Sequence, residues 1–549
     1  MTFLPSRVPA VFKYKTVPAP TGGLNARDSL ANMPETDALV LNNWWPQPYG
    51  LQVRPGYEWW TTGLPGAVNT LASWSDVNGT TKLFAWAGTA TDGFGVYDVS
   101  TRMLTTDPPL VAAIDGLSNS RWYHTQMSNS AGNFLIAVNG ADAGIVYEST
   151  GAVRILYAAV PPAPPTPLVD NTWYGLDSSE VICITTHQKR LWAVKKDSSL
   201  GWFLAPNALW GEWKSFDFGP LFSMGGYIAF ITTWTIDDGN GAEDHLVIMS
   251  SEGQVAVYGG TDPEDDTKWQ LVGLYFAGAP ASGRRGYYKV GGDMILLTQR
   301  GLVSMAALLV STKVNEPSTG LKSEKVQLLI STLLSDTANQ VDWELYFNAS
   351  LNMFLINIPS PVLGGNRQLA CNLVTSASPW TYFVNVDAVT WATYDNYAYF
   401  SDYEGRVCRF WVGNKDAVHL DNTGGLEVKT EVQQAYNYLG VMAVQKQVGM
   451  YRPTFITSDD ITFGSRIEYD FQVRPVAVPS SPIPNAVDTA LWDTALWDQG
   501  RWGGGVITDR RWVMAEGIGS AASLRMAMQS QCEVTWVGTD YSFRVGGLL

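Results

Sequence analysis

The chain has 549 residues, and its 23 Trp, 24 Tyr and 52 Gly, with only 16% of residues charged, indicate many short strands joined by tight turns. A formal net charge of −15 argues against a surface that clasps nucleic acid or an anionic membrane, because both need clustered Lys and Arg. Four widely spaced cysteines without a C-x-x-C pair argue against a zinc site or a disulfide framework, and with no long apolar run we expect neither a signal peptide nor a membrane span.

Residues 1–65 are predicted to form an N-terminal arm. The Gly pair at 22–23 is a turn signal, and Pro34 followed by acidic residues predicts a short helix over residues 39–43. The sequence WWP at 44–46 should end that helix, because proline lacks an amide donor and forces the residue before it to be extended. The sequence RPG at 54–56 marks a second turn.

The middle of the chain, residues 66–420, repeats a unit in which an apolar strand, a turn with Gly or Asp and a second strand follow one another. Such hairpins cannot bury their apolar faces alone, so their recurrence indicates a radial or stacked array. We predict a β-propeller of about six to seven blades; a pair of sandwiches and a β-solenoid are the alternatives. The seven candidate units span residues 82–101, 133–150, 190–205, 245–260, 293–308, 353–383 and 397–413.

Two segments interrupt this pattern. The proline-rich stretch at 161–167 should behave as a stiff, extended spacer. Residues 311–342 have leucines spaced nearer to a period of 3.6 than of 2, which predicts a helical insertion there. That helix either docks a partner or packs against its own blade, and the sequence leaves both possibilities open.

Residues 421–549 are predicted to form a separate C-terminal β domain, because alternating polar and apolar residues replace the earlier pattern. The tandem sequence LWDTALWDQGRW places Trp492, Trp497 and Trp502 at equal spacing. A period of five suits neither a helix face nor a strand face, so we interpret it as an irregular loop. Its indoles either lie on a partner, at an interface, or fold back onto their own domain.

The sequence contains few candidates for catalytic chemistry. The four histidines form no H-E-x-x-H or paired-ligand arrangement, and neither a G-x-S-x-G elbow nor a P-loop is present. The acidic loops at 235–245 and 261–266 offer oxygen ligands for a cation but miss the EF-hand pattern, so we read them as solvated loops. We therefore expect a non-enzymatic protein without catalytic residues, metal site or cofactor.

Residues 22–60 resemble the N-termini of podovirus tail proteins of the nozzle, or tail-tubular, class. In that family a GG(I/L)N leader runs through a short acidic helix and an aromatic-proline step to an R-x-G turn. The W-D-rich run and the ending YSFRVGGLL at 541–549 also look like the C-terminal parts of such proteins. The matching leader residues are Gly22, Gly23, Leu24, Asn25, Asp37, Leu41, Asn42, Trp44, Pro46, Arg54 and Gly56.

This resemblance implies a structural virion protein, located in the phage tail and in the host cytoplasm during assembly. It implies a nozzle protomer that forms a homohexameric ring around the DNA exit channel and links the portal and adaptor proteins to the tail tip. Tail fibres or spikes and a tail needle or plug are the further partners implied. Genomic DNA would pass through the lumen without specific binding, and an acidic wall would let it slide.

Two alternatives stay open at this point: a receptor-binding or tailspike-like module that stacks Trp and Tyr on sugars, and a glycan-cleaving propeller enzyme with carboxylates from separate blades. Under the leading interpretation, Trp44, Trp45 and Arg54 are predicted to fix the arm against the C-terminal domain or a neighbouring chain. Together with Trp492, Trp497 and Trp502 they are the candidate assembly residues.

Overall fold

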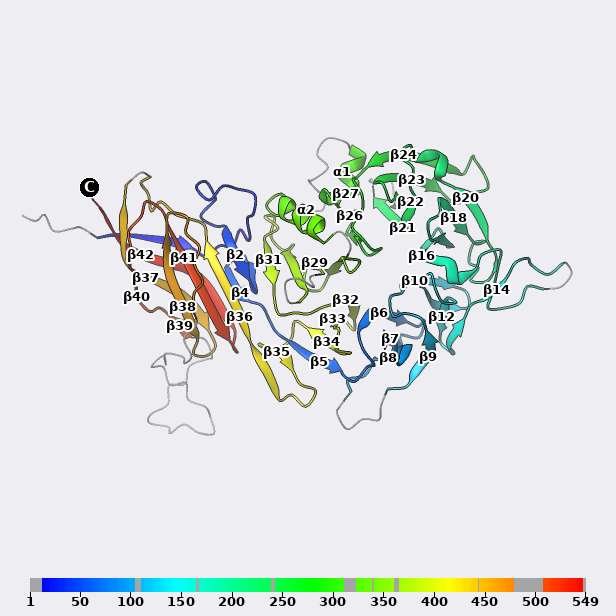
Figure 1. Ribbon diagram of the computed structural model, residues 1–549, viewed down its shortest axis with the longest axis horizontal. Helices are drawn as coiled ribbons and strands as arrows, with labels where there is room; N and C mark the ends of the chain where they lie inside the picture. The colour runs from blue at the N-terminus through cyan, green and yellow to red at the C-terminus, as the bar shows by residue number, and fades with distance from the viewer. Residues whose placement is uncertain are drawn as a thin grey trace, which may run out of the picture.

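The computed structural model describes residues 12–103, 110–163, 167–237, 242–310, 322–337, 340–359, 365–442, 444–477 and 507–546. Within these residues almost all regular secondary structure is β-strand, as predicted. A ring of short sheets occupies one end of an elongated molecule, and two sheets with longer strands occupy the other (Figure 1). No helix in this part of the chain is long and apolar enough to cross a membrane.

Seven antiparallel sheets follow one another along the described part of the ring. The second strand of each is buried on both faces, as expected for a strand packed between neighbouring sheets. In chain order the sheets are β6 Val68–Ser75, β7 Thr81–Thr89, β8 Gly93–Asp98, β9 Ala112–Leu117; β10 Tyr123–Asn129, β11 Gly132–Val138, β12 Ile145–Glu148, β13 Gly151–Arg154; β16 Val181–His187, β17 Arg190–Lys195, β18 Leu200–Phe203, β20 Lys214–Asp217; β21 Ile228–Asp237, β22 Ala242–Ser250, β23 Gln254–Gly260, β24 Trp269–Phe276; β25 Tyr287–Val290, β26 Asp293–Thr298, β27 Gly301–Ser304; β28 Glu344–Asn348, β29 Met353–Ile358, β30 Arg367–Asn372, β31 Trp380–Phe383; and β32 Thr390–Tyr394, β33 Tyr397–Ser401, β34 Val407–Phe410 with β5 Tyr57–Thr61.

The ring closes on itself, which makes it a β-propeller. The innermost strand of each sheet contacts the next sheet, and β32 of the seventh sheet contacts β6 of the first. Strand β5, which directly precedes β6 in the chain, pairs antiparallel with β34 and completes the seventh sheet. Hydrogen bonds between the two ends of the propeller segment therefore hold the ring shut. Separate apolar clusters fill the spaces between neighbouring sheets, and many of the tryptophans lie there.

The fifth sheet has three strands in the described chain, and two helices follow it. Helix α1, Met305–Val310, was not expected from the sequence, whereas α2, Gln327–Asp336, lies within residues 311–342, where the leucine spacing indicates a helix. Helix α2 contacts β27 of the fifth sheet, and its Ile330 and Leu334 are buried in the largest apolar cluster. Residues 311–321 of that expected insertion lie outside the described residues.

A loop projects from the propeller rim at the end far from the two long sheets (Figure 1). A small parallel sheet anchors it, formed by β14 Leu156–Ala158, β15 Thr172–Tyr174 and β19 Gly211–Glu212. We call this projecting segment, residues 156–163 and 167–171 with β14 included, the distal loop. Short 3-10 helices, Ser178–Glu180 and Gly219–Leu221, flank the strands of the third propeller sheet.

Two sheets at the other end pack face to face as a sandwich around one apolar core. The arm contributes strands to both, so the N-terminal segment is woven into the sandwich. The first sheet contains β1 Lys13–Pro18, β3 Trp44–Gln47, β4 Gly50–Val53, β37 Lys446–Thr457, β39 Ile507–Asp509, β40 Val513–Met514 and β42 Val534–Val545. The second contains β2 Ala38–Asn42, β36 Gly424–Gln434, β38 Thr462–Tyr469 and β41 Ala522–Ser530, and β35 Lys415–Val418 joins β36 to β5 of the propeller.

The helix predicted over residues 39–43 is wrong, because these residues form β2 and the bend that follows it. Strand β2 pairs antiparallel with β36, a partner almost 400 residues away, and this pairing overrides the local helix signals. The WWP sequence at 44–46 continues as β3, in a hairpin where Pro46 lies opposite Leu51. Strand β3 is the last strand on its side of the sheet, a place where proline's missing amide donor is tolerated.

Candidate functional site

The leader residues singled out from the sequence lie at the junction between the propeller and the sandwich. Trp44 and Trp45 are adjacent in β3, so their side chains point to opposite faces of the strand. The Trp44 ring lies 6.2 Å from that of Trp536 in the sandwich core. The Trp45 ring packs 5.9 Å from Phe383 and 5.2 Å from Trp411, in the cluster between the sixth and seventh propeller sheets. One strand thus fastens both domains.

Arg54 is locked into this junction by a buried ion pair. Its Nη1 and Nη2 donate to the two carboxylate oxygens of Asp416, each at 2.7 Å, and its Nε donates to Asn43 Oδ1 at 2.9 Å. The Arg54 side chain is 0% exposed, and its guanidinium lies over the rings of Phe383 and Phe410. This two-pronged geometry is the strongest form of Arg–carboxylate contact.

Asn43 connects three elements of the junction and was not singled out from the sequence. Its side-chain amide donates to the carbonyl oxygens of Val384 and Lys429 at 3.0 and 2.7 Å. Its Oδ1 accepts from Arg54 Nε and from the Val384 amide. Asn43 has a positive φ of 59°, a conformation that Asn adopts more readily than most residues, and this bend turns the chain from β2 into β3.

The first turn of the leader is tied down in the same way. Asp37 is fully buried and accepts from Asn25 Nδ2 at 2.7 Å and from Lys325 Nζ at 2.8 Å. Gly23 has a φ of +81°, and a Cβ there would lie 2.6 Å from the backbone nitrogen of Trp380. Only glycine fits this approach without displacing the backbone. The leader motif is therefore a set of residues that pack and bond within one chain.

The predicted assembly residues fall into two groups. Trp44, Trp45 and Arg54 come together at the junction, each buried within the chain itself, so an effect on contacts between chains must act through the arrangement of the two domains. The other three, Trp492, Trp497 and Trp502, lie outside the described residues. Their role at an interface stays a prediction.

The acidic loop at 261–266 is held by basic side chains. Asp262 pairs with Arg190 at 3.0 Å and Glu264 pairs with Lys214 at 2.6 Å. Of the other acidic loop, residues 238–241 are not described. Among the described residues there is no group of three His, Cys, Asp or Glu side chains placed to hold a metal ion.

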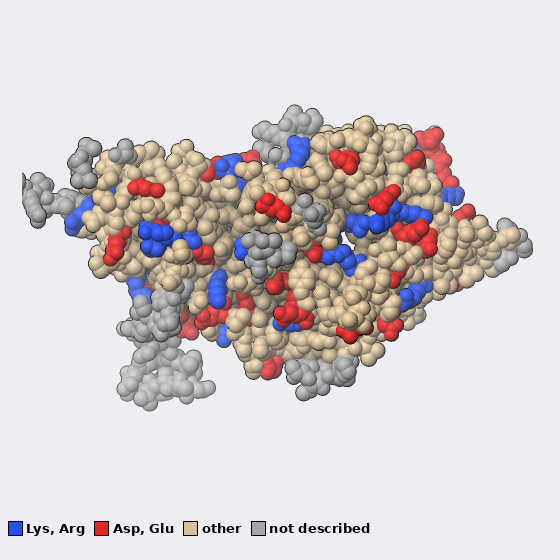
Figure 2. All heavy atoms as spheres, in the orientation of Figure 1, with Lys and Arg blue, Asp and Glu red and all other residues tan. Residues whose placement is uncertain are grey.

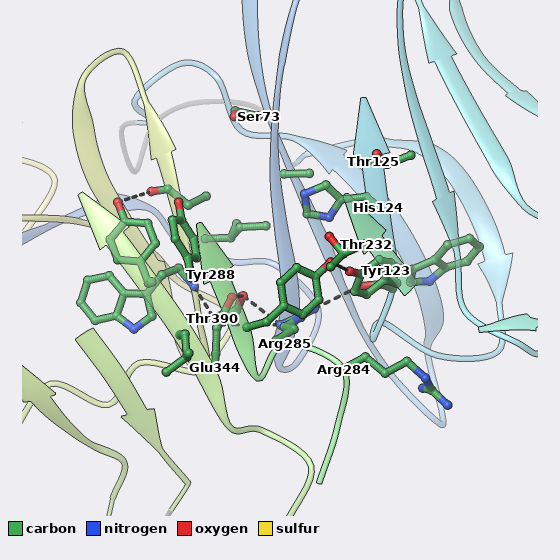
Figure 3. A pocket seen from close by; sticks show the side chains of 18 of the residues that line it. Ser73, Tyr123, His124, Thr125, Thr232, Arg284, Arg285, Tyr288, Glu344 and Thr390 are labelled. Atoms are coloured by element: carbon green, nitrogen blue, oxygen red, sulfur yellow. Dashed lines mark hydrogen bonds and ion pairs between the residues drawn. The ribbon is translucent and has the colours of Figure 1, made fainter. Parts of the chain in front are cut away.

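The axis of the propeller contains two cavities, of about 600 and 610 Å³. The first is lined by residues of all seven innermost strands, including Ser73, Thr125 and Thr232 (Figure 3). Both cavities have Trp122, Tyr123, Arg284 and Arg285 among their walls. These four side chains therefore stand where the two cavities approach each other.

Arg285 forms the polar centre of this axis. Its Nη1 donates to Thr390 Oγ1 at 2.9 Å and lies 4.0 Å from Glu344 Oε2, while its Nη2 donates to Thr70 Oγ1 and to the Asn69 and Trp122 carbonyls (Figure 3). Burial raises the pKa of Glu344 and lowers that of Arg285, and the attraction between the two charges opposes both shifts. Arg285 thus links strands of the first, second and seventh sheets.

Sequence reasoning missed this axis entirely. Its residues come from strands spread over more than 300 positions, usually two or three from each, and carry no common motif. The arginine pair at 284–285 is not a distinctive local signal, because a second Arg-Arg pair stands at 510–511.

No family model and no curated protein matches the sequence. Among solved structures, the extracellular domain of a one component system from B. thetaiotaomicron has 10% identity and a TM-score of 0.37, with 66% of this chain and 40% of that chain covered. The computationally designed Ika8 protein has 10% identity and a TM-score of 0.33, with 65% of this chain and 100% of that chain covered. The Cps50 (Swd1) β-propeller domain of Myceliophteria thermophila has 9% identity and a TM-score of 0.35, with 65% of this chain and 99% of that chain covered. The chain spans less than half the length of the first of these. Likeness this distant carries no argument about function, and the β-propeller fold rests on the chain's own strand order and closed ring of contacts.

Proposed function

We propose that this chain is a structural, non-enzymatic protein of a short-tailed phage tail. In this role it is a nozzle protomer that assembles into a ring around the DNA exit channel, between the portal and adaptor proteins and the tail tip. The leader residues 22–56 support the family assignment by resemblance. The observation on the folded chain that carries the proposal is a pair of unlike apolar surfaces at opposite ends of the molecule.

The first of these surfaces is the distal loop. It exposes Leu156, Tyr157, Val160, Leu168 and Val169, each at least half exposed and Val160 at 74%. Apolar side chains gathered on a projecting loop typically mark a contact with another protein. Prolines in the same loop restrict its backbone, which lowers the entropy lost when the loop docks.

The second is the face of the first sandwich sheet that points away from the core, which we call the outer sandwich face. It exposes Met450, Ile456, Met514 and Val537, with Met514 at 82%, and Trp512 lies beside them under the Arg452 guanidinium. A closed ring joins one surface of each protomer to a different surface of the next. Two unlike apolar surfaces at opposite ends supply what such a contact requires.

The acidic balance of the chain also fits this role. Large side chains, among them Tyr123 and Arg285, meet on the propeller axis, so duplex DNA does not fit through a single propeller. The DNA channel of the proposed ring would therefore lie between protomers. With a net charge of −15 per chain, a ring of six would repel the phosphate backbone and let DNA slide.

The test is the mass of the purified protein, measured by light scattering after size-exclusion chromatography. We expect a particle of six chains, and a Val160→Asp, Leu168→Asp double variant should shift it toward the monomer without changing the thermal unfolding midpoint. The matched control is Val77→Asp, which places a charge at another exposed valine on a propeller turn. If the double variant forms rings equally well, the distal loop does not take part in the contact between protomers.

A further inference from the structure

The second axial cavity, which we call the arginine cavity, is lined by basic but not acidic side chains. Its wall contains Arg121, Arg284 and Arg285, and no Asp or Glu is among its described lining residues. Such a site is unusual in a chain whose acidic residues outnumber its basic ones by 51 to 36. Figure 2 shows charged side chains of both signs gathered around a hollow in the propeller.

Two of the three arginines already have partners. Arg285 is committed to Thr390, Thr70 and the neighbouring carbonyls, as described above. Arg121 forms an ion pair with Asp342 and donates to the Val341 carbonyl at 3.0 Å. These two side chains shape the cavity and add positive potential, and each already holds protein partners.

Arg284 differs from both neighbours. It has no ion pair or hydrogen bond with any described residue, and its Nε is buried without a partner. In Figure 3 its side chain points away from Glu344, and the residue lies in the bend that precedes β25. A guanidinium has five N–H donors in a planar fork that matches the two oxygens of a carboxylate. The enclosed Nε is out of reach of a ligand in the cavity, but the Nη1 and Nη2 groups, which have no hydrogen bond to a described residue, can donate to a ligand oxygen there.

We propose that the arginine cavity binds an acidic sugar, with the sugar's carboxylate held by Arg284. The cavity volume of about 610 Å³ lies within the range of small-molecule sites. Its remaining wall offers two neutral polar groups for sugar hydroxyls, the side-chain amide nitrogen of Asn119 and a lone pair of the Ser251 hydroxyl, whereas the Asn139 amide is already bonded to Asp142 and Ala141. The half-exposed ring of Tyr227 at its edge offers a stacking surface. A small inorganic anion would pair with the arginine but leave the polar groups and the Tyr227 ring unused. A carboxylate carried on a hydroxylated sugar ring would contact the arginine, the polar groups and the tyrosine ring.

This binding activity goes beyond the proposed assembly role and is independent of it. It gives the propeller a ligand site of its own, and the ring experiment above neither requires nor excludes it. Conversely, a failure to bind sugar acids would leave the assembly proposal as it stands.

Calorimetric titration of the full chain with sodium D-glucuronate at low ionic strength tests the site. We expect saturable binding of one glucuronate per chain, weakened by added salt, and no binding of glucose, which lacks the carboxylate. Arg284→Gln should lower the affinity by about tenfold or more, because it removes a charge-assisted contact. Arg284→Lys keeps the charge but not the fork, so its loss should be smaller. The matched control is Arg154→Gln, an exposed arginine on β13 outside the cavity, which should bind as the unaltered chain does.

Four results would overturn the proposal. They are an absence of saturable glucuronate binding, equal binding of glucose, unchanged affinity in Arg284→Gln, and binding of inorganic phosphate without binding of glucuronate. Thermal unfolding of each variant shows whether it is folded. If Arg284→Gln does not fold, Tyr227→Ala at the half-exposed edge serves in its place, and unchanged glucuronate affinity there would contradict the stacking surface.

Discussion

The buried pair of Arg54 and Asp416 gives a sharp test of how the two domains are joined. Replacing Asp416 with Ala leaves a fully buried guanidinium without its carboxylate, and it removes two hydrogen bonds of 2.7 Å. Breaking a buried ion pair from one side typically costs about 3–5 kcal/mol. That cost corresponds to a rise of about two to three and a half powers of ten in the equilibrium constant for local opening.

Hydrogen exchange of the full chain, measured by mass spectrometry, shows which segments open more often in the variant. We expect amide protection to fall in β2 to β5 and in β35, and to stay unchanged in the fourth propeller sheet, which is remote from the pair. A double variant, Arg54→Met with Asp416→Leu, should recover much of the protection, because it removes both charges together. The control is Glu35→Gln, which breaks a surface pair with Lys15 worth about 1 kcal/mol or less. Unchanged protection in Asp416→Ala would refute the role of this pair in the junction.

Three further predictions concern single side chains. Trp44→Ala and Trp45→Ala should each lower the free energy of unfolding by about 3–5 kcal/mol. Hydrogen exchange should rise in the sandwich for Trp44→Ala and in the sixth and seventh propeller sheets for Trp45→Ala. The same exchange pattern in both variants would contradict the assignment of the two side chains to different cores. Gly23→Ala should lower the unfolding temperature, because φ is +81° and a Cβ would meet Trp380; an unchanged midpoint would show that this turn can relax. Burial lowers the pKa of His187 to about 4. Between about pH 6.5 and 4, the unfolded chain therefore binds a proton on this histidine that the folded chain does not bind. The free energy of unfolding should fall by up to about 3 kcal/mol as the pH drops through that window. His187→Phe should flatten this part of the curve of unfolding temperature against pH, and an equally steep curve would contradict the assignment.

The repeating part of the fold could be predicted from the sequence because its signals are local. Each of the seven predicted units contains strands of one propeller sheet, such as β7 with β8 and β22 with β23, where apolar runs and a turn are neighbours in the chain. The innermost strands were missed, since they carry polar residues toward the axis and lack the strong apolar pattern of the second strands.

The leader shows what local signals cannot decide. Acidic residues after Pro34 favour a helix, yet β36 offers strand pairing that residues 38–42 accept, and nothing near them in sequence announces this partner. The same holds for Arg54, whose partner lies 362 positions away. The axial cavities are even harder to predict from local sequence, because each innermost strand contributes only a few residues to the first cavity.

The central claim is that this chain builds a ring, and the most direct measurement is electron microscopy of the purified protein, alone and with the phage adaptor protein. We expect closed rings of six protomers, with neighbouring chains in contact through the distal loop and the outer sandwich face. A strictly monomeric particle under both conditions would contradict the proposed function.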